Sequence, residues 1–282
     1  MASHLKDRVI AITGASSGIG AATAVACADA GMDVALAARR EDRLRQVAAE
    51  VERHGRRALV VVCDVQSDEQ VQRMIDATCS GLGRLDALFA NAGYGLFSTI
   101  ADTGADRMRD IFETNFWGTV RCVQAVVPVM RRAGSGHVLI CTSAVSEIGL
   151  PMYGYYAATK AAQDSIAGAM RAELAGQNIL VSSVHPIGTA TEFFDVVRRE
   201  SGNGDGDELL NTPAPLIHSS QRVARAVVKC LRRPCPEVWP SVGARLGLAL
   251  TTATPRLGAW AMRRLMKRRY PGAESVRTKR SV

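Results

Sequence analysis

Residues 8–20 read RVIAITGASSGIG, a short apolar run that passes directly into a glycine-rich turn. The next stretch, 19–30, is rich in alanine and repeats apolar residues every three to four positions, which is typical of a helix. Glycines between a strand and a helix let the backbone bend sharply and approach a pyrophosphate, which the N–H groups at the helix N-terminus can bind. The stretch therefore predicts a β–turn–α unit that binds a dinucleotide, with a tight turn that binds no ligand as the alternative.

The rest of the chain repeats this alternation. Short, continuous apolar runs of the kind found in buried parallel strands are separated by segments with helical spacing. We predict strands at 8–12, 33–38, 58–63, 85–90, 136–142 and 179–184, and helices at 19–30, 41–54, 68–80, 105–131 and 156–175. This alternation favours an α/β fold, a doubly wound parallel sheet of the Rossmann-like type with helices on both faces.

We expect one catalytic domain with a C-terminal appendage. Residues 1–237 are assigned to a Rossmann-like catalytic domain, which includes a substrate loop at about 190–215. Residues 238–282 are assigned to a helical, basic appendage. Residues 263–282 alone hold eight Lys and Arg against Glu274, which accounts for most of the net charge of +8. Because the basic charge is confined to this terminus, we expect no nucleic-acid partner.

The composition excludes several classes of protein. Of the 282 residues, 47% are apolar and 22% charged, which excludes a disordered chain. Seven cysteines without a C-x-x-C pair argue for reduced thiols rather than a disulfide framework. The five histidines are scattered, so no metal site is expected. The chain opens without a secretory signal and has no apolar run of about 18 residues, so we predict a soluble, cytoplasmic protein.

The end of the second predicted strand bears on the choice of cofactor. In a dinucleotide-binding fold this position faces the adenosine ribose, where an acidic residue would accept a hydrogen bond from the 2′-hydroxyl of NAD. This chain has Ala38 there, followed by Arg39 and Arg40. Guanidinium groups suit a 2′-phosphate, so we predict NADP(H), bound through Arg39 above all. The alternative is that both arginines begin a solvated helix face.

Tyr156 and Lys160 form a Y-x-x-x-K pair, whose members lie one turn apart on the same face of a helix. A neighbouring ammonium favours the phenolate and lowers the pKa of a tyrosine, which lets the side chain exchange a proton near neutral pH. We interpret the pair as part of a catalytic site. An exposed pair on a helix surface is the alternative.

Taken together, these features resemble the short-chain dehydrogenase/reductase family in its single-domain form. The resemblance covers roughly residues 5–195, with the motifs in the family's order. Residues 13–20 match the cofactor loop. The other matching motifs are Asp64-Val65, the adenine-contacting pair after the third strand; Asn91-Ala92-Gly93, after the fourth strand; Asn115 in N-F-W-G, the catalytic asparagine; and Ser143, thirteen residues before Tyr156, the catalytic serine.

The resemblance implies a catalytic set of Asn115, Ser143, Tyr156 and Lys160. Tyr156 would be the general acid in carbonyl reduction and the base in alcohol oxidation, while Ser143 would hydrogen-bond the carbonyl oxygen. Lys160 would bind the nicotinamide ribose and lower the pKa of Tyr156, and Asn115 would hold a water in a relay to Lys160. The implied cofactor-binding residues are Gly14, Ser16, Ser17, Gly18, Ile19, Gly20, Arg39, Asp64, Val65, Asn91, Ala92, Gly93, Tyr156, Lys160, Pro186, Thr189 and Thr191.

One motif departs from the family's pattern. After the sixth strand the family usually reads P-G-x-x-x-T, whereas this chain has Pro186-Ile187-Gly188-Thr189-Ala190-Thr191. The branched Ile187 in place of glycine would shift the backbone that contacts the nicotinamide amide, or would narrow the substrate pocket. This departure weakens the assignment of Thr189 and Thr191 to the cofactor, but it does not affect the core chemistry.

The sequence therefore predicts an NADP(H)-dependent carbonyl reductase or alcohol dehydrogenase, which interconverts a carbonyl and a secondary alcohol by hydride transfer. The alternative is a non-catalytic dinucleotide-binding sensor or scaffold, which would not need the catalytic set. The resemblance also implies a homodimer or homotetramer that pairs through the helices holding Asn115 and Tyr156. Residues that could line an apolar substrate pocket, or belong to an ordinary core, are Ile148, Leu150, Met152, Phe193 and Phe194.

The segment 238–270 lies beyond the region of strong resemblance. It repeats apolar residues every three to seven positions, at Leu246, Leu250, Leu257, Trp260 and Leu265, and Pro255 is expected to split it into two helices. A basic cluster overlaps its end, at Arg263, Arg264, Lys267, Arg268 and Arg269. An apolar stripe with a cationic end suits a helix that lies on an anionic membrane surface, which would give a weak peripheral contact. A lid or an oligomer contact is the alternative.

Overall fold

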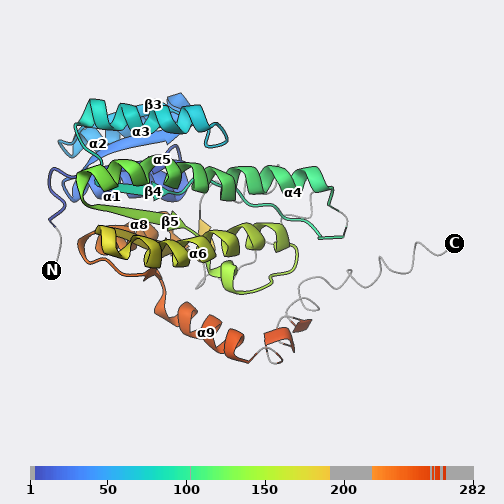
Figure 1. Cartoon of the computed structure of the whole chain (residues 1–282). Coiled ribbons are helices and arrows are strands. Elements are labelled where there is room, and N and C mark those ends of the chain that lie inside the picture. Colours follow the sequence, from blue (N-terminus) through green and yellow to red (C-terminus); the bar gives the residue numbers. More distant parts are fainter. Residues whose placement is uncertain are drawn as a thin grey trace.

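A seven-stranded sheet forms the centre of the molecule (Figure 1). The computed structural model describes residues 4–101, 103–190, 218–254, 256, 258–260 and 263–264. The strands lie in the order β3-β2-β1-β4-β5-β6-β9, and every neighbouring pair is parallel. Their bounds are β1 Val9–Thr13, β2 Asp33–Ala38, β3 Ala58–Val62, β4 Ala87–Ala90, β5 Gly136–Cys141, β6 Ile179–Val184 and β9 Glu237–Val238. The predicted doubly wound α/β fold is confirmed.

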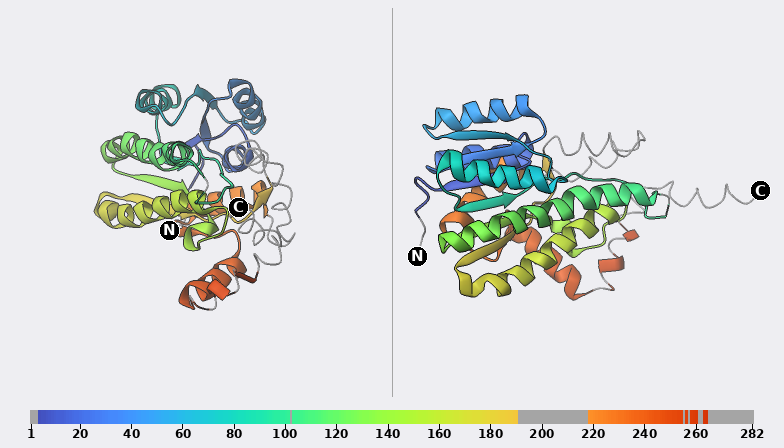
Figure 2. Two further views of the ribbon diagram at one scale, coloured as in Figure 1. Left: turned by 90° about the vertical axis from the view of Figure 1, so that its right-hand side faces the viewer. Right: turned by 45° about the horizontal axis from the view of Figure 1, so that its top comes forward.

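Helices cover both faces of this sheet (Figure 2). One face is covered by α1 (Gly18–Asp29), α2 (Glu41–Arg53) and α8 (Ser220–Arg232). The other is covered by α3 (Asp68–Leu82), α5 (Gly118–Ala133) and α6 (Gly154–Leu174). The remaining helical elements are α4 (Ala105–Phe112), η1 (Glu113–Trp117), η2 (Ala144–Glu147), η3 (Ala175–Gln177) and α9 (Val242–Ala253).

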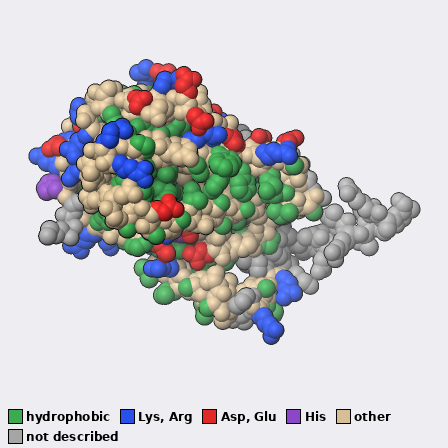
Figure 3. All heavy atoms as spheres, viewed as in Figure 1, with side chains coloured by type: hydrophobic (Ala, Val, Ile, Leu, Met, Phe, Trp, Pro, Cys, Tyr) green, Lys and Arg blue, Asp and Glu red, His purple; other side chains and the backbone are tan. Residues whose placement is uncertain are grey.

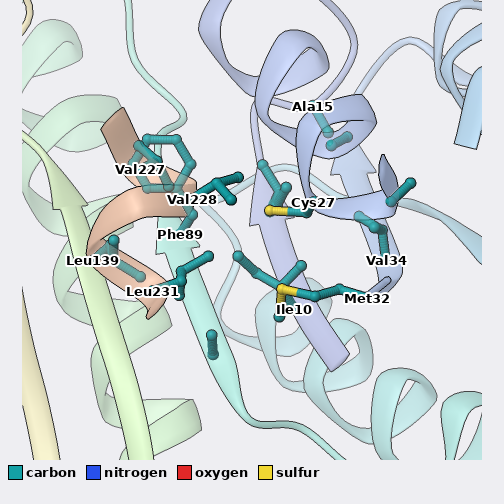
Figure 4. Packing of buried hydrophobic residues seen from close by; sticks show 14 of the residues in the cluster. Ile10, Ala15, Cys27, Met32, Val34, Phe89, Leu139, Val227, Val228 and Leu231 are labelled. Carbon is teal, nitrogen blue, oxygen red and sulfur yellow. The ribbon is translucent and has the colours of Figure 1, made fainter. Parts of the chain in front are cut away.

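The strands are mostly apolar because most of their residues are buried. Successive residues of a strand point to opposite faces, so Ile10 and Ile12 of β1 join the cluster under α1, α2 and α8, whereas Val9 and Ala11 join the cluster under α3, α5 and α6. Figure 4 shows the first cluster, in which side chains of α8 lie against Phe89 of β4. Two separate cores therefore hold the sheet between its helical layers.

The order of the strands reverses at β1, with β2 and β3 on one side and β4, β5 and β6 on the other. In open parallel sheets, ligands bind at the carboxyl ends of the strands beside such a reversal. Each of four strands ends one or two residues before a predicted site residue: β1 before Gly14, β4 before Asn91, β5 before Ser143 and β6 before Pro186. The topology thus gathers residues from four predicted motifs at one edge of the sheet.

The structure contains elements that we did not predict. The predicted helix 105–131 is divided into α4, the π-helical turn η1 and α5. Strand β9 was missed because it has two residues, between Pro236 and Trp239. Helix α8 was missed although its buried residues have helical spacing, at Val223, Ala224, Val227, Val228 and Leu231.

Strand β9 crosses the boundary that we predicted between the catalytic domain and the appendage. Val238 pairs with Val184 of β6, so the sheet extends one residue into the segment 238–282. The division at 237 stays a prediction. Residues 191–217, which hold nearly all of the predicted substrate loop, lie outside the described residues; the flanking strands β7 (Thr189–Ala190) and β8 (His218–Ser219) pair with each other. Within the described part of the chain, no helix is long and apolar enough to span a membrane.

Candidate active site

The glycine-rich turn after β1 is closely packed against the segment that follows β4. Gly14 has φ +67°, and a Cβ there would lie 2.9 Å from the Cα of Ala92. A Cβ on Gly20 would lie 2.3 Å from the carbonyl oxygen of Gly14. A side chain at either position would therefore collide with backbone. The predicted need for glycine at these two positions has this steric basis.

Hydrogen bonds join the same two segments. The side-chain amide of Asn91 donates to the carbonyl oxygen of Thr13 at 3.0 Å, and the backbone N–H groups of Asn91 and Ala92 donate to Thr13 Oγ1 at 3.0 and 3.1 Å. At the start of α1, the Ser17 side chain makes no capping hydrogen bond. The first N–H groups of a helix have no intrahelical acceptor, so this end of α1 fits a phosphate. The turn can therefore hold the pyrophosphate of a dinucleotide.

Two arginines follow the carboxyl end of β2, and they make different contacts. Arg40 Nη2 donates to Ser16 Oγ at 3.1 Å and to Ser17 Oγ at 2.9 Å, across the glycine-rich turn. Arg39 Nη1 lies 4.0 Å from Asp64 Oδ2, and its side chain is 74% exposed. The sequence favoured Arg39 as the anion ligand, whereas the structure brings Arg40 into contact with the turn. Both guanidinium groups are close to the predicted adenosine end of the cofactor site.

The segment after β3 is fixed from two sides. Asp64 Oδ1 accepts a hydrogen bond from the backbone N–H of Gln66 at 3.0 Å, and its own N–H donates to Gln70 Oε1 at 2.9 Å. Val65 is buried, and a Cβ on Gly118 would lie 2.6 Å from Val65 Cγ2. The predicted adenine-contacting pair is thus held between α3 and the start of α5.

Asn115 lies in the π-helical turn η1 and is completely buried. Its Oδ1 accepts from the backbone N–H of Tyr94 at 2.9 Å, and its Nδ2 donates to the carbonyl oxygen of Tyr94 at 2.9 Å and to Thr159 Oγ1 at 3.1 Å. Its carbonyl oxygen accepts from Gln163 Nε2 at 2.7 Å and from Thr119 Oγ1 at 2.9 Å. Asn115 therefore joins the segment after β4 to α6.

Lys160 approaches the same point from α6. It is 4% exposed, and its Nζ donates to the carbonyl oxygen of Cys141 at 2.7 Å and lies 5.6 Å from the centre of the Tyr156 ring. A Cβ on Gly93 would lie 2.9 Å from Asn115 Oδ1 and 3.6 Å from Lys160 Nζ. The Asn-Ala-Gly segment and two of the predicted catalytic residues therefore lie close together.

Tyr156 and Ser143 complete the predicted set. Burial raises the pKa of Tyr156 above its usual range, and a hydrogen bond with the side chain of Ser143 opposes this effect. Burial also lowers the pKa of Lys160. We expected Lys160 to lower the pKa of Tyr156; burial acts in the opposite direction, because it penalises the charged phenolate.

The segment after β6 lies against the one after β5. The carbonyl oxygen of Pro186 accepts from the backbone N–H of Ala144 at 2.9 Å and from Ser143 Oγ at 3.4 Å. Thr189 Oγ1 donates to the carbonyl oxygen of Ile187 at 2.6 Å, so this hydroxyl already has an acceptor within its own segment. Thr191, Phe193 and Phe194 lie outside the described residues.

Apolar side chains surround the ring of Tyr156. Leu150 and Met152 pack with Phe97 and Tyr153 in one small cluster that also contacts Tyr156, and the rings of Phe97 and Tyr153 meet edge to face at 5.5 Å. A second cluster, formed by Leu96, Ile111 and Tyr155, contacts Tyr156 as well. Two of the predicted pocket residues, Leu150 and Met152, therefore do lie beside the candidate acid/base.

Sequence reasoning missed several residues around the site. Gln163 is completely buried, and it is one turn beyond Lys160 on α6; this helical spacing was the available signal. A polar group also forms from Glu147, Asp164 and His185, whose ligand-capable atoms lie within 4.8 Å of one another. Burial lowers the pKa of His185, which hydrogen-bonds Ser183 at 3.0 Å. Sequence spacing could not indicate this group, because its members come from three separate segments.

Comparisons of the sequence with known proteins agree on the family. The family model for short chain dehydrogenases matches residues 8–202. An A-factor type gamma-butyrolactone 1'-reductase (1S-forming) of Streptomyces virginiae is 34% identical over 226 residues, which are 79% of this chain and 87% of that protein. Glycine betaine reductase ATRR of Emericella nidulans is 32% identical over 235 residues, or 82% of this chain, and this chain spans 18% of that protein's length.

Solved structures with a similar fold carry either of two dinucleotides. An alcohol dehydrogenase from Thermococcus sibiricus, complexed with 5-hydroxy-NADP, has a TM-score of 0.71 and 28% identity and covers 82% of this chain and 94% of its own. A short chain dehydrogenase from Mycobacterium paratuberculosis, bound to NAD, has a TM-score of 0.71 and 28% identity and covers 82% of this chain and 92% of its own. With a family match over residues 8–202, the chain belongs to the short-chain dehydrogenase/reductase family of oxidoreductases.

Proposed function

We propose that this protein is an NADP(H)-dependent oxidoreductase that interconverts a carbonyl compound and a secondary alcohol, with Tyr156 as the general acid and base. The observation that carries the proposal is the position of Tyr156. Its ring lies 5.6 Å from Lys160 Nζ, and its side chain is hydrogen-bonded to Ser143. Lys160 in turn lies beside Gly93, at the sheet edge where the glycine-rich turn also lies.

Each residue has a distinct role in this proposal. When bound, NADPH supplies the hydride that reduces the carbonyl carbon. Tyr156 donates its proton to the carbonyl oxygen, and Ser143 hydrogen-bonds that oxygen as negative charge develops on it. Lys160 binds the nicotinamide ribose, and Asn115 keeps the loop after β4 and helix α6 in register. Burial raises the pKa of Tyr156 and so favours the protonated phenol, which suits reduction.

The preference for NADP(H) is proposed from charge. Ala38 ends β2 where an acidic residue would bind the 2′-hydroxyl of NAD, and the guanidinium groups of Arg39 and Arg40 follow. Arg40 lies across Ser16 and Ser17, and Arg39 is exposed and free to turn toward a phosphate near Asp64. We assign the binding of the 2′-phosphate to Arg39 and Arg40 together.

The substrate is proposed to be apolar. Leu150, Met152, Phe97 and Tyr153 form an apolar wall next to Tyr156, which would exclude water from the reacting carbonyl and favour a hydrophobic compound. A non-catalytic sensor or scaffold is not favoured, because such a protein would not need the set Asn115, Ser143, Tyr156 and Lys160.

The protein is further proposed to be a homodimer or homotetramer in the cytoplasm. Figure 3 shows a hydrophobic area over α4, η1 and the adjoining part of α5; Met108 of α4 and Trp117 of η1 are 39% and 48% exposed. Exposed apolar areas of this kind mark interaction sites. Light scattering at micromolar concentration tests the assembly, and a monomer would contradict it.

Substitution of Tyr156 by phenylalanine tests the catalytic proposal. The phenol supplies the proton, so Tyr156→Phe should lower kcat by about 10²–10⁴ in NADPH-dependent reduction of a panel of apolar ketones. The dissociation constant of NADPH and the melting temperature should change little. Wild-type turnover by this variant would contradict the role of Tyr156. Absence of turnover in the wild type, with intact NADPH binding, would favour the sensor.

Arginine variants test the cofactor assignment. A charge-assisted contact with a phosphate contributes about 1.5–3 kcal/mol, so Arg39→Ala and Arg40→Ala should each weaken NADPH binding roughly tenfold or more. NADH binding should change little, because NADH has no 2′-phosphate. Arg45→Ala, an exposed arginine one turn further along α2, is the matched control. Equal losses for both cofactors would contradict the assignment.

A further inference from the structure

Helix α9 exposes apolar side chains that most helices would bury. Val242, Leu246 and Leu250 are 70%, 66% and 62% exposed, and the helix has no buried residue. These three residues are spaced by four, so they lie on one side of the helix. Ala244 and Leu248 are half-buried, and α9 packs against η2. The helix is therefore apolar both where it contacts the protein and where it faces away from it.

The attachment of α9 to the rest of the molecule leaves this outer side uncovered by the described residues. Arg245 Nη2 lies 3.2 Å from Glu237 Oε2, and Ser241 accepts a hydrogen bond from the N–H of Ala244 at the start of the helix. Both contacts lie at the N-terminal end of α9, where the Ser241 contact caps the helix and the Arg245 contact links it to β9. Figure 1 and the left view of Figure 2 show α9 on the outside of the molecule, away from the sheet.

The charged residues of this region are all basic. From residue 242 to residue 264 the sequence contains no Asp or Glu, and after Arg245 it contains Arg256, Arg263 and Arg264. All three of these arginines are exposed. The guanidinium of Arg264 lies 5.2 Å from the centre of the Trp260 ring, which is 52% exposed. Tryptophan and arginine are residues that favour the boundary between lipid and water.

We propose that this exposed C-terminal face docks on the surface of an anionic lipid bilayer; the face consists of Val242, Leu246, Leu250, Trp260, Arg256, Arg263 and Arg264. The apolar side chains would enter the boundary between headgroups and acyl chains, and the arginines would bind the lipid phosphates. The sequence adds further cations at Lys267, Arg268 and Arg269.

The charge of the face favours a lipid surface over a second copy of the chain. A symmetric contact uses the same patch on both subunits, so it would enclose the arginines of both copies without any acidic residue of the segment 242–264 to pair with them. Like charges brought together in an interface cost several kcal/mol. An anionic bilayer carries the charge that complements these arginines. It also accepts apolar side chains without requiring a matching surface shape.

Docking through this face would place the candidate active site near the membrane. Helix α9 packs against η2, and η2 begins at Ala144, directly after Ser143. An apolar substrate dissolved in the bilayer could then reach the site without crossing bulk water. The docking is nevertheless independent of the proposed activity, because vesicle binding can be measured without substrate or cofactor.

Vesicle co-sedimentation of the full chain tests the proposal. Vesicles of phosphatidylcholine mixed with phosphatidylglycerol should bind the protein at low salt, and vesicles of phosphatidylcholine alone should bind it far less. High salt should weaken binding, because it screens the arginines. The double variant Arg263→Gln/Arg264→Gln should bind anionic vesicles more weakly, with a partition coefficient that falls roughly fivefold for each arginine removed. The double variant Leu246→Asp/Leu250→Asp should lose tenfold or more, since two carboxylates oppose both insertion and attraction to lipid phosphates.

Val62→Asp is the matched control, because Val62 is 50% exposed but lies at the end of β3. It should leave vesicle binding unchanged. The melting temperature should be the same for all of these variants as for the wild type. No binding of the intact protein to anionic vesicles at low salt would overturn the proposal. Equal binding to neutral vesicles would overturn the part assigned to the arginines. A dimer that dissociates in the Leu246→Asp/Leu250→Asp variant would assign the face to a second copy instead.

Discussion

The interior around Asn115 and the outer side of α9 have opposite chemistry. Five polar residues near Asn115 are at most 4% exposed, and we call them the buried polar cluster: Asn115, Thr119, Thr159, Lys160 and Gln163. On α9, three large apolar residues are more than 60% exposed, namely Val242, Leu246 and Leu250. Each region thus contains the residue type that its surroundings should disfavour.

The two regions resolve this conflict in different ways. In the buried polar cluster, hydrogen bonds within the fold satisfy most of the polar groups, such as the three made by the Asn115 side chain. On α9, no described residue covers these three apolar side chains, which leaves them open to a partner from outside the described part of the chain. A buried polar residue therefore points to a contact inside the molecule, and an exposed apolar stripe points to a contact outside it.

The largest effect is expected where the buried polar cluster is broken at its centre. Asn115→Leu removes three buried side-chain hydrogen bonds, which at about 1 kcal/mol each should lower the free energy of unfolding by roughly 3 kcal/mol. Activity should be lost as well, because the loop after β4 is no longer tied to α6. Urea unfolding measures the change. A loss below about 1 kcal/mol would show that water can replace these hydrogen bonds.

The buried pair of His137 and Ser182 extends the comparison to pH. His137 on β5 hydrogen-bonds Ser182 at 2.8 Å, and burial lowers the pKa of His137 to about 4 from a usual 6.5. Between these values the unfolded chain binds a proton that the native state does not, so stability should fall as pH drops from 6.5 to 4. The contribution of His137 is roughly 3 kcal/mol.

The measurement is the free energy of unfolding at pH 7 and at pH 4.5, for the wild type and for His137→Gln. The wild type should lose more stability between the two pH values than the variant, because glutamine does not titrate. Other groups titrate equally in both proteins and cancel in the difference. Parallel pH profiles would mean that His137 is accessible to protons in the native state.

A smaller effect is expected at the edge of the buried polar cluster. Gln163→Leu removes the hydrogen bonds from Nε2 to Asn115 and Thr119, but it also removes a buried Oε1 that has no partner. The carbonyl oxygen of Asn115 keeps its bond from Thr119. The net loss should be about 1 kcal/mol. Gln163→Glu should cost more than Gln163→Leu, since it buries a charge, and the reverse order would refute this account.

The smallest effect is expected on α9. Leu246→Ser should change the free energy of unfolding by less than about 0.5 kcal/mol, because the side chain is already in water. Val227→Ser on α8 is the matched variant: Val227 is completely buried, so the loss should be roughly 2 kcal/mol or more. Calorimetry on both variants checks the contrast. A large loss at Leu246 would mean that another part of the chain covers this face.

The sequence predicted the local elements well and the connections between them less well. The six apolar runs became strands within two residues of their predicted ends, because continuous apolar residues bury both faces of a strand. Strand β9 could not be predicted from its two residues, since it exists only through pairing with β6. The π-helical turn at Glu113–Trp117 was likewise invisible, because its residues also suit an ordinary helix.

The same division applies to the candidate site. Sequence alone determined the glycine-rich turn at 14–20 and the spacing of Tyr156 and Lys160, because glycine geometry and helical periodicity act over a few neighbouring residues. Tertiary structure decided that Arg40 lies on Ser16 and Ser17, that Gln163 reaches Asn115, and that burial raises the pKa of Tyr156. These outcomes depend on desolvation and on contacts between residues far apart in the chain, which no local pattern records.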